Sequence, residues 1–229
     1  MTLLQRSRRK IVSILDRMRD FIENENNCNM RTNGEAHFLR ALNDFYKGTM
    51  TVIDVGSASG EYSSFIPSAT VYSFDGRQNY LISDIGGTRT FYVRTETPEL
   101  SSVNRLEYLD SKYGPIEEIK MPTKSLETVI KENNIKHISL LKIDTEGHEM
   151  HVLKGLGEYL RADFIDFIQF ERGNAEADCR LKTLYDLLGG RGFDVRKMYR
   201  HSIEKLPYMS QNENMNYANY VAVSKSVNY

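Results

Sequence analysis

Side chains that can do chemistry are densest in the segment LLKIDTEGHEMHVLKG, from Leu140 to Gly155. An apolar run typical of a buried strand ends at Asp144, and acids and a histidine follow where a helix is expected to begin. Open α/β sheets bind ligands at the carboxyl ends of their strands, and carboxylates buried there need a partner or a task. The candidates for catalysis are therefore Asp144, Glu146, His148 and Glu149.

Simpler roles for the same segment stay open. Glu146 and Glu149 can complement the positive end of a helix dipole, and His151 is more typical of a packed or surface histidine than of a ligand. His148 and His151 lie three residues apart, but HEMH differs from the HExxH motif of zinc enzymes. We predict no metal here, with a divalent cation among the carboxylates as the lesser alternative.

A second candidate is IDVGSASGEY, from Ile53 to Tyr62, where a short β-branched strand runs into glycines. Gly56 and Gly60 permit a tight turn and let a ligand approach the backbone, and a following helix directs its free N–H groups at that ligand. The spacing differs from the GxGxxG of dinucleotide-binding proteins, and a plain turn would use glycines too. Asp75 follows the strand TVYSF, where it can bond ribose hydroxyls or form an Asp-Gly turn.

The bulk properties exclude several classes of protein. The 229 residues carry a formal net charge of -1, which gives no global field for nucleic acid or a membrane. We find no long uncharged apolar run and no leader pattern, so we expect a cytoplasmic protein without a membrane span. The basic run Arg6–Lys10 suits a solvated helix end or, less well, an acidic partner. Cys28 and Cys179 are isolated and indicate thiols in a reducing compartment.

Strands alternate with helices, which predicts a doubly wound α/β sheet with mostly parallel strands and an antiparallel finish. Residues 1–34 form an N-terminal extension with a helix over 3–22, and residues 35–229 form the α/β domain, which opens with a helix over 35–48. Residues 94–120 are expected to be mostly loop, as a lid or substrate wall, with a helix near 106–111. The expected strands are 51–56, 70–74, 137–144, 164–171, 193–200 and 219–225, and the expected later helices are 124–135, 147–160 and 179–193.

The motifs together resemble the FkbM family of S-adenosylmethionine-dependent methyltransferases. KIDTEGHE is similar to that family's KID-x-EG-x-E run, and IDVGSASGEYS to its cofactor loop. ISDIGGTRTFYV, KSLETVI, IQFE and NYVAV resemble further family segments in the same order, from about Glu35 to Ser224. The resemblance implies a Rossmann-like class I fold and O-methylation of a hydroxyl on a sugar, glycan or similar small molecule. Separately, we expect that the chain can form a homo-oligomer.

The resemblance also implies roles for single residues, with S-adenosylmethionine as the cofactor. Asp75 takes the place of the glutamate that binds the ribose, and His148 occupies a variable position. The acidic positions of the KID-x-EG-x-E run are Asp144, Glu146 and Glu149. The other expected cofactor residues are Asp54, Gly56, Ser57 and Gly60 near the methionine and ribose, and Ser83 and Asp84 near the adenine.

The chain departs from the family pattern between its second and third strands. FDG replaces the family's FEP, Pro67 cuts short the first helix, and GRQN is too short to form the helix of a parallel crossover. Either TVYSF and YLIS form a hairpin, or YLIS leaves the sheet. In both cases the wall over the adenine is thinned, and residues 94–120 or another subunit can fill it.

Methyl transfer is an in-line displacement that needs a positioned acceptor and a base for its proton. His148 has a suitable ordinary pKa, and Asp144 or Glu146 can serve instead. The shortened region favours a rival of another class, a binding protein that has lost catalysis. A nicotinamide-dependent oxidoreductase is the third possibility, and the glycine spacing disfavours it.

Overall fold

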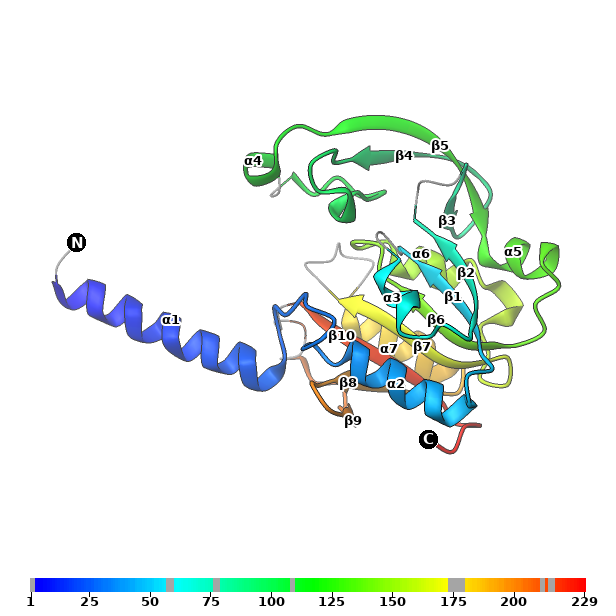
Figure 1. The fold of residues 1–229 in the computed structure, drawn as a ribbon. Helices are drawn as coiled ribbons and strands as arrows, with labels where there is room; N and C mark the ends of the chain where they lie inside the picture. Colours follow the sequence, from blue (N-terminus) through cyan, green and yellow to red (C-terminus); the bar gives the residue numbers. More distant parts are fainter. Residues whose placement is uncertain are drawn as a thin grey trace.

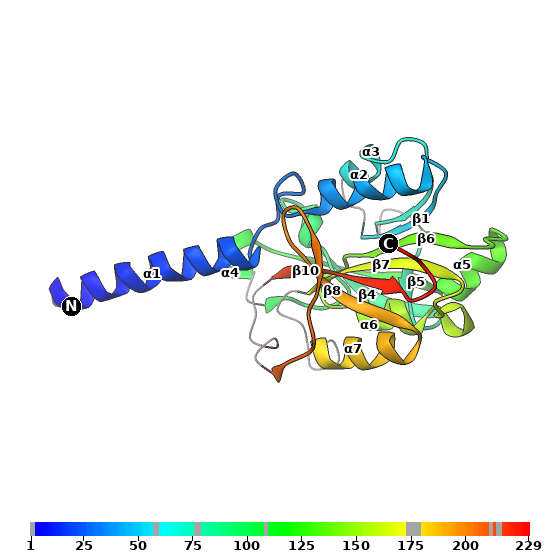
Figure 2. The same ribbon diagram turned by 90° about the horizontal axis from the view of Figure 1, so that it is seen from below.

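The computed structural model describes residues 3–56, 60–75, 79–107, 110–172, 180–210, 213 and 217–229. Its largest element is a seven-stranded, mostly parallel sheet with helices on both faces (Figures 1 and 2). Ser57, Cys179 and residues 76–78 of the GRQN segment lie outside the described residues. In sheet order the strands are β2 (Thr70–Phe74), β1 (Thr51–Val55), β6 (Ile138–Ile143), β7 (Ile165–Arg172), β10 (Ala218–Ser224), β8 (Phe193–Met198) and β9 (Ile203–Lys205).

The first four strands in this order are parallel, as the alternation of strands and helices predicted. β10 inserts between β7 and β8 and is antiparallel to both, so the antiparallel finish is confirmed. The short strand β9 forms a hairpin with β8 and was not predicted. The carboxyl ends of β1, β2, β6 and β7 meet at one edge of the sheet, which we call the carboxyl edge.

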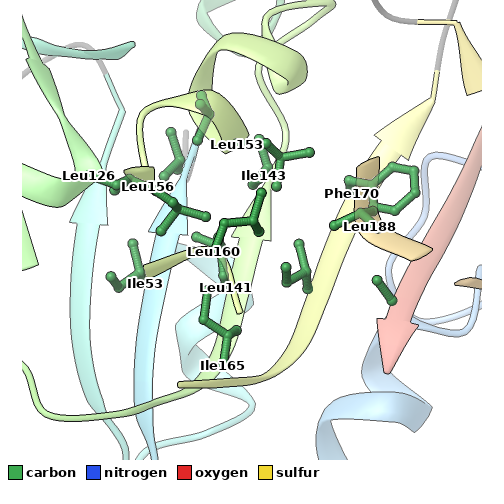
Figure 3. Packing of buried hydrophobic residues seen from close by; sticks show 14 of the residues in the cluster. Ile53, Leu126, Leu141, Ile143, Leu153, Leu156, Leu160, Ile165, Phe170 and Leu188 are labelled. Atoms are coloured by element: carbon green, nitrogen blue, oxygen red, sulfur yellow. The ribbon is translucent and has the colours of Figure 1, made fainter. Parts of the chain in front are cut away.

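Two apolar clusters sandwich the main sheet. One packs α2 (Glu35–Tyr46) and α3 (Glu61–Ser64) against one face, with Phe38, Leu42 and Tyr62 buried among strand residues. The other packs α5 (Leu126–Glu132), α6 (Glu149–Lys154) and α7 (Leu181–Gly190) against the opposite face (Figure 3). Successive strand residues point to opposite faces, and β6 is buried along its whole length, which fits a strand covered on both sides.

The predicted loop is largely confirmed: of the described residues in 94–120, only residues 117–120 belong to a named strand, in a second, three-stranded sheet that was not predicted. Its strands are β3 (Leu81–Ser83), β5 (Glu117–Ser125) and β4 (Gly87–Val93), in that order. YLIS therefore leaves the main sheet, and β3 pairs with β5 in parallel. The remaining turns of helix here are η1 (Pro98–Leu100) and α4 (Asp110–Tyr113), the latter close to the predicted helix.

The N-terminal helix α1 (Leu3–Glu23) confirms the predicted range within a residue and projects away from both sheets (Figures 1 and 2). The predicted helix over 147–160 is broken, because the backbone at Gly157 adopts φ 55° and the chain continues as the turn η3 (Gly157–Tyr159). Among the described residues, none of the helices combines the length and the apolar character that a membrane crossing requires.

Candidate active site

A pocket of about 570 Å³, counting the space open to solvent, lies at the carboxyl edge of the main sheet. Gly56 after β1, Asp75 after β2, and Asp144 after β6 line its floor. Its other walls are apolar or come from the loop after β4: Phe74, Tyr80, Leu81, Ile82, Phe91, Pro98, Glu99, Ser101, Ser102 and Val103.

Residues of the loop over 98–103 thus form a wall of the pocket. This agrees with the expectation that residues 94–120 form a lid or a substrate wall. Arg94 fixes this loop: its guanidinium is buried and donates to Asp110 Oδ1 at 2.7 Å and to the carbonyl of Leu106 at 3.0 Å. Ser102 Oγ donates to the carbonyls of Thr145 and Glu146, both at 3.2 Å. The small sheet therefore holds one side of the pocket against the loop that follows β6.

Gly56 is required by the backbone, whatever binds in the pocket. Its φ is 89°, and a Cβ there would lie 1.6 Å from the carbonyl oxygen of Asp144. Its N–H donates to the carbonyl of Phe74 at 2.6 Å, which ties the ends of β1 and β2 together. Gly60 has φ 71° and open space around it, so a ligand can approach its backbone. Ser57 lies outside the described residues, and its predicted role stays a prediction.

Lys142 holds the acids beneath the pocket. Its Nζ donates to Asp144 Oδ2 at 2.9 Å, lies 3.8 Å from Asp54 Oδ1, and sits 5.2 Å from the centre of the Tyr62 ring. Burial works to lower the pKa of Lys142, but the charges of Asp144 and Asp54 raise it above its ordinary value. Among the described residues no hydrogen bond reaches either oxygen of Asp54, and burial raises the pKa of that carboxyl to about 6.

Three acids at the carboxyl edge form what we call the carboxylate cluster, Asp144, Glu146 and Glu171, each with an oxygen within 4.8 Å of the others. Burial and the charge of Asp144 raise the pKa of Glu171 well above its ordinary value, so Glu171 keeps its proton and donates it to Asp144. Burial works to raise the pKa of Asp144, but Lys142 and that hydrogen bond outweigh it and lower the pKa. Such a cluster has the ligands for a divalent cation, yet Lys142 and the shared proton already compensate its charge.

Glu146 is the member of the carboxylate cluster with the least compensation. Its backbone is held at φ 54°, an uncommon conformation for a residue other than glycine. Burial, followed by the charges of Asp144 and Glu149, raises its pKa from 4.5 to about 8. A carboxyl group with this pKa changes its protonation near neutral pH, as a general acid or base requires.

Glu149 is a clamp for the loop. Its Oε1 accepts from the backbone N–H groups of Thr145 and Gly147, both at 3.1 Å, and from the Thr145 hydroxyl at 3.0 Å. The side chain is buried and turned back into its own loop. The predicted catalytic role of Glu149 has no support in this geometry, because its hydrogen bonds are used to shape the turn after β6.

His148 belongs to a separate group, the histidine cluster, which comprises Ser83, Asp84, Arg89, His148 and His151. His148 Nε2 lies 3.0 Å from Ser83 Oγ, and its ring stacks on that of His151 with centroids 4.5 Å apart. Ser83 Oγ and Arg89 both donate to Asp84 Oδ1, at 2.9 and 2.8 Å. Burial, then the charges of His151 and Arg89, lower the pKa of His148 to about 3.

The histidine cluster changes the expected roles of three residues. Because Ser83 uses its proton on Asp84, His148 Nε2 donates to Ser83, and the unprotonated Nδ1 is left as an acceptor. His148 lines the pocket through this ring but is too weak a base at neutral pH to favour proton removal. Ser83 and Asp84 lie behind His148, outside the pocket lining, so the geometry does not support their expected place beside an adenine.

The N-terminal loop reaches the same edge of the sheet. Asn26 N–H donates to the carbonyl of Tyr217 at 2.9 Å, directly before β10. Burial raises the pKa of the Cys28 thiol, and the charges of Glu146 and Asp144 add to that rise. Burial, then the charge of Glu171, raises the pKa of Tyr217 in the same way. Cys28 and Tyr217 therefore lie near the acids of the carboxylate cluster.

Comparison of the sequence with known proteins assigns the chain to a family. The model of the Methyltransferase FkbM domain matches residues 23–195. The chain belongs to the FkbM methyltransferase family. It is 32% identical over 110 residues to Methyltransferase 1 of Beauveria bassiana (strain ARSEF 2860), a match that covers 48% of this chain and 43% of that protein. The chain thus matches less than half of that relative, and no solved structure matches it significantly.

The family membership confirms the resemblance drawn from the motifs. The family match begins at residue 23 and so includes the loop that carries Cys28. Sequence reasoning about this FkbM protein missed Lys142 and Glu171 as members of the site. Glu171 ends a buried strand as Asp144 does, so the same argument from strand ends would have found it. Lys142 has no such signal, because a lysine inside an apolar strand is recognised only when its acidic partners are placed.

Proposed function

We propose that this chain is an S-adenosylmethionine-dependent O-methyltransferase with a Rossmann-like class I arrangement. The order of the strands supports this fold: the chain runs from β1 outward to β2, then crosses back to β6 on the other side of β1. Ligands of such sheets bind outside the carboxyl ends where the direction of winding reverses. The pocket lies at that point, between the ends of β1 and β6.

The lining of the pocket suits the parts of S-adenosylmethionine. The aromatic side chains Phe74, Tyr80 and Phe91 provide an apolar surface for an adenine. Asp75 stands after β2, where a carboxylate can accept from both ribose hydroxyls. Asp144, which stays ionised, stands after β6 and complements the positive sulfonium. The observation that carries the proposal is this pairing of Asp75 and Asp144 across one pocket.

We assign the residues around Asp144 to binding of the second substrate, the hydroxyl compound that accepts the methyl group. Bound S-adenosylmethionine supplies an electrophilic methyl group; a new C–O bond forms, the C–S bond breaks, and its electron pair stays on sulfur. Asp144 borders both the pocket and the carboxylate cluster, so Glu146 and Glu171 would hold an acceptor hydroxyl beside a cofactor bound in the pocket. The proton of that hydroxyl passes to the carboxylate cluster, with Glu146 as the favoured base.

The raised pKa of Glu146 fits this role when the charge of the cofactor is included. A positive charge nearby stabilises a carboxylate and lowers its pKa. Cofactor binding therefore prepares the base, because Glu146 loses its proton as the sulfonium arrives. The carboxylates and Tyr217 are hydrogen-bonding groups of the kind that bind sugar hydroxyls, which supports a sugar, glycan or similar small hydroxyl compound as the acceptor.

Calorimetry with S-adenosylhomocysteine tests the cofactor site. We expect saturable binding to the wild type, and Asp75→Asn to weaken it by roughly tenfold or more, as expected for loss of a charged hydrogen bond. Asp163→Asn is the matched control, since Asp163 is exposed and remote from the pocket. Gly56→Val is a poor variant, because its Cβ would collide with the carbonyl of Asp144 whatever the ligand.

The rival proposals predict different results. A binding protein without catalysis would bind S-adenosylhomocysteine weakly or not at all. The observation that favours it is the connection between β2 and β3, which is too short for the helix of a parallel crossover. An oxidoreductase would bind NAD instead. Tight binding of NAD with none of S-adenosylhomocysteine would refute the proposed function.

A further inference from the structure

Helix α1 exposes an apolar face that no described part of the chain covers. Ile11, Leu15 and Ile22 are 58%, 59% and 66% exposed. Large apolar residues in soluble proteins are exposed singly as a rule, and a contiguous exposed patch marks an interaction surface. At 3.6 residues per turn, one face of α1 is formed by Ile11, Ile14, Leu15, Met18, Phe21 and Ile22.

The charges of α1 are sorted around this face. Arg8 and Arg19 fall along one border of the apolar face, and Lys10 and Arg17 fall along the other. The acids Asp16, Asp20 and Glu23 fall on the opposite side of the helix, together with Arg9. An apolar face bordered by bases on both sides, with the acids turned away, is the pattern of helices that lie in the plane of a lipid surface.

The body of the protein continues this pattern. The guanidinium of Arg200 lies 4.2 Å from the centre of the Phe21 ring, on the border formed by Lys10 and Arg17. Lys197 Nζ contacts Glu23 at 3.2 Å, which fixes the last turn of the helix to β8. The rest of α1 projects from the body in both views, so a flat surface can reach its apolar face (Figures 1 and 2).

A second copy of the chain fits this face less well. Two α1 helices packed through their apolar faces, parallel or antiparallel, would bring basic borders against basic borders. Like charges beside such a seam oppose pairing. An anionic bilayer surface has the opposite charge, and it attracts each nearby lysine or arginine.

We propose that α1 docks this protein on anionic lipid surfaces. The apolar face enters the boundary between head groups and acyl chains, and Arg8, Lys10 and Arg17 meet the anionic head groups. Arg19 pairs with Asp20 of the same helix at 3.0 Å and is not counted among these contacts. Arg200 adds a contact from the body and sets the orientation of the domain. The proposal is independent of the methyltransferase chemistry, since the helix shares no residue with the pocket or the carboxylate cluster.

Co-sedimentation of the full chain with vesicles tests the proposal. We expect binding to equimolar phosphatidylglycerol and phosphatidylcholine, weak binding to phosphatidylcholine alone, and weaker binding at high salt. Leu15→Ser/Met18→Ser should abolish the binding. Lys10→Gln/Arg17→Gln should lower the partition coefficient roughly 30-fold, since each of the two charges near the surface contributes about fivefold. The replaced side chains are exposed, so thermal unfolding should not change.

Lys182→Gln/Lys225→Gln is the matched control, because it removes the same charge from exposed sites of the body and should leave vesicle binding within about twofold. The proposal is overturned if anionic vesicles fail to bind the wild type, or bind Leu15→Ser/Met18→Ser equally. It is also overturned if sedimentation equilibrium shows a dimer that Leu15→Ser/Met18→Ser splits, since a second copy would then cover the face.

Discussion

The carboxylate cluster and the histidine cluster extend from the same turn after β6, yet their charges are compensated to different degrees. In the histidine cluster, Asp84 accepts from Ser83 and Arg89 and lies 3.2 Å from His151, and its pKa is lowered despite some burial. In the carboxylate cluster, burial and mutual repulsion raise the pKa of Glu146 to about 8. The hydrogen bonds of Asp84 suit a structural role. The uncompensated charge of Glu146 is typical of a residue that binds a ligand or transfers a proton.

The largest expected effect comes from the acid that joins the pocket to the carboxylate cluster. Asp144→Asn keeps the shape but removes the charge that faces the sulfonium, and we expect kcat to fall roughly 100- to 10,000-fold. Glu149→Gln, on the same turn, should lower kcat less than about tenfold, since Glu149 shapes the loop. Equal losses in the two variants would mean that loop geometry, and not the charge of Asp144, limits the rate. Methyl transfer to an identified acceptor is the measurement.

Removal of the buried cation should have the next largest effect. Lys142→Met leaves Asp54 and Asp144 without their shared ammonium, and loss of one partner of a buried ion pair costs about 3–5 kcal/mol. Urea unfolding at pH 7 measures this loss. Lys182→Met, which breaks an exposed pair with Asp186, should change the free energy of unfolding by less than about 1 kcal/mol. A loss of similar size in both variants would contradict the central position of Lys142.

The stability contributed by Glu146 should fall as the pH rises. Its pKa is about 8 in the folded protein and 4.5 ordinarily, so the contribution is complete below pH 4.5 and is lost as the pH passes 8. Glu146→Gln should therefore be more stable than the wild type at pH 8, by roughly 1–3 kcal/mol because the neighbouring acids share the protons. Urea unfolding between pH 5 and 8 checks this, because these values lie between the ordinary pKa of Glu146 and its pKa in the folded protein. Parallel curves for the two proteins would show that Glu146 does not titrate there.

His148 should show the opposite dependence and the smallest effect at neutral pH. Its pKa is about 3 when folded and 6.5 ordinarily, so its contribution is complete above pH 6.5 and is lost as the pH falls through 3. His148→Gln should cost about 1 kcal/mol at pH 7 through the lost contact with Ser83, but should remove part of the acid sensitivity. The pH profile of kcat should keep its shape; a lost limb would identify His148 as the base.

The main sheet and the turn after β6 could be predicted from sequence because their signals are local. An apolar run, a carboxylate and a glycine occur close together in both TVIDVG and LLKIDTEG. The small sheet could not, since β5 carries lysines and a proline at alternating exposed positions and reads as polar loop. Its pairing with β3 and β4 joins segments far apart in the chain, and only tertiary contact stabilises it.

The position of β10 affects how the main sheet can fold during synthesis of the chain. The last long strand of the chain occupies the slot between β7 and β8, and both neighbours bond to it along their length. Until residues 218–224 have been synthesised, those two strands present unpaired edges that can join other chains. The order of the strands in the main sheet therefore differs from the order in which they are synthesised. We therefore expect a nascent chain to be prone to aggregation until β10 has been synthesised.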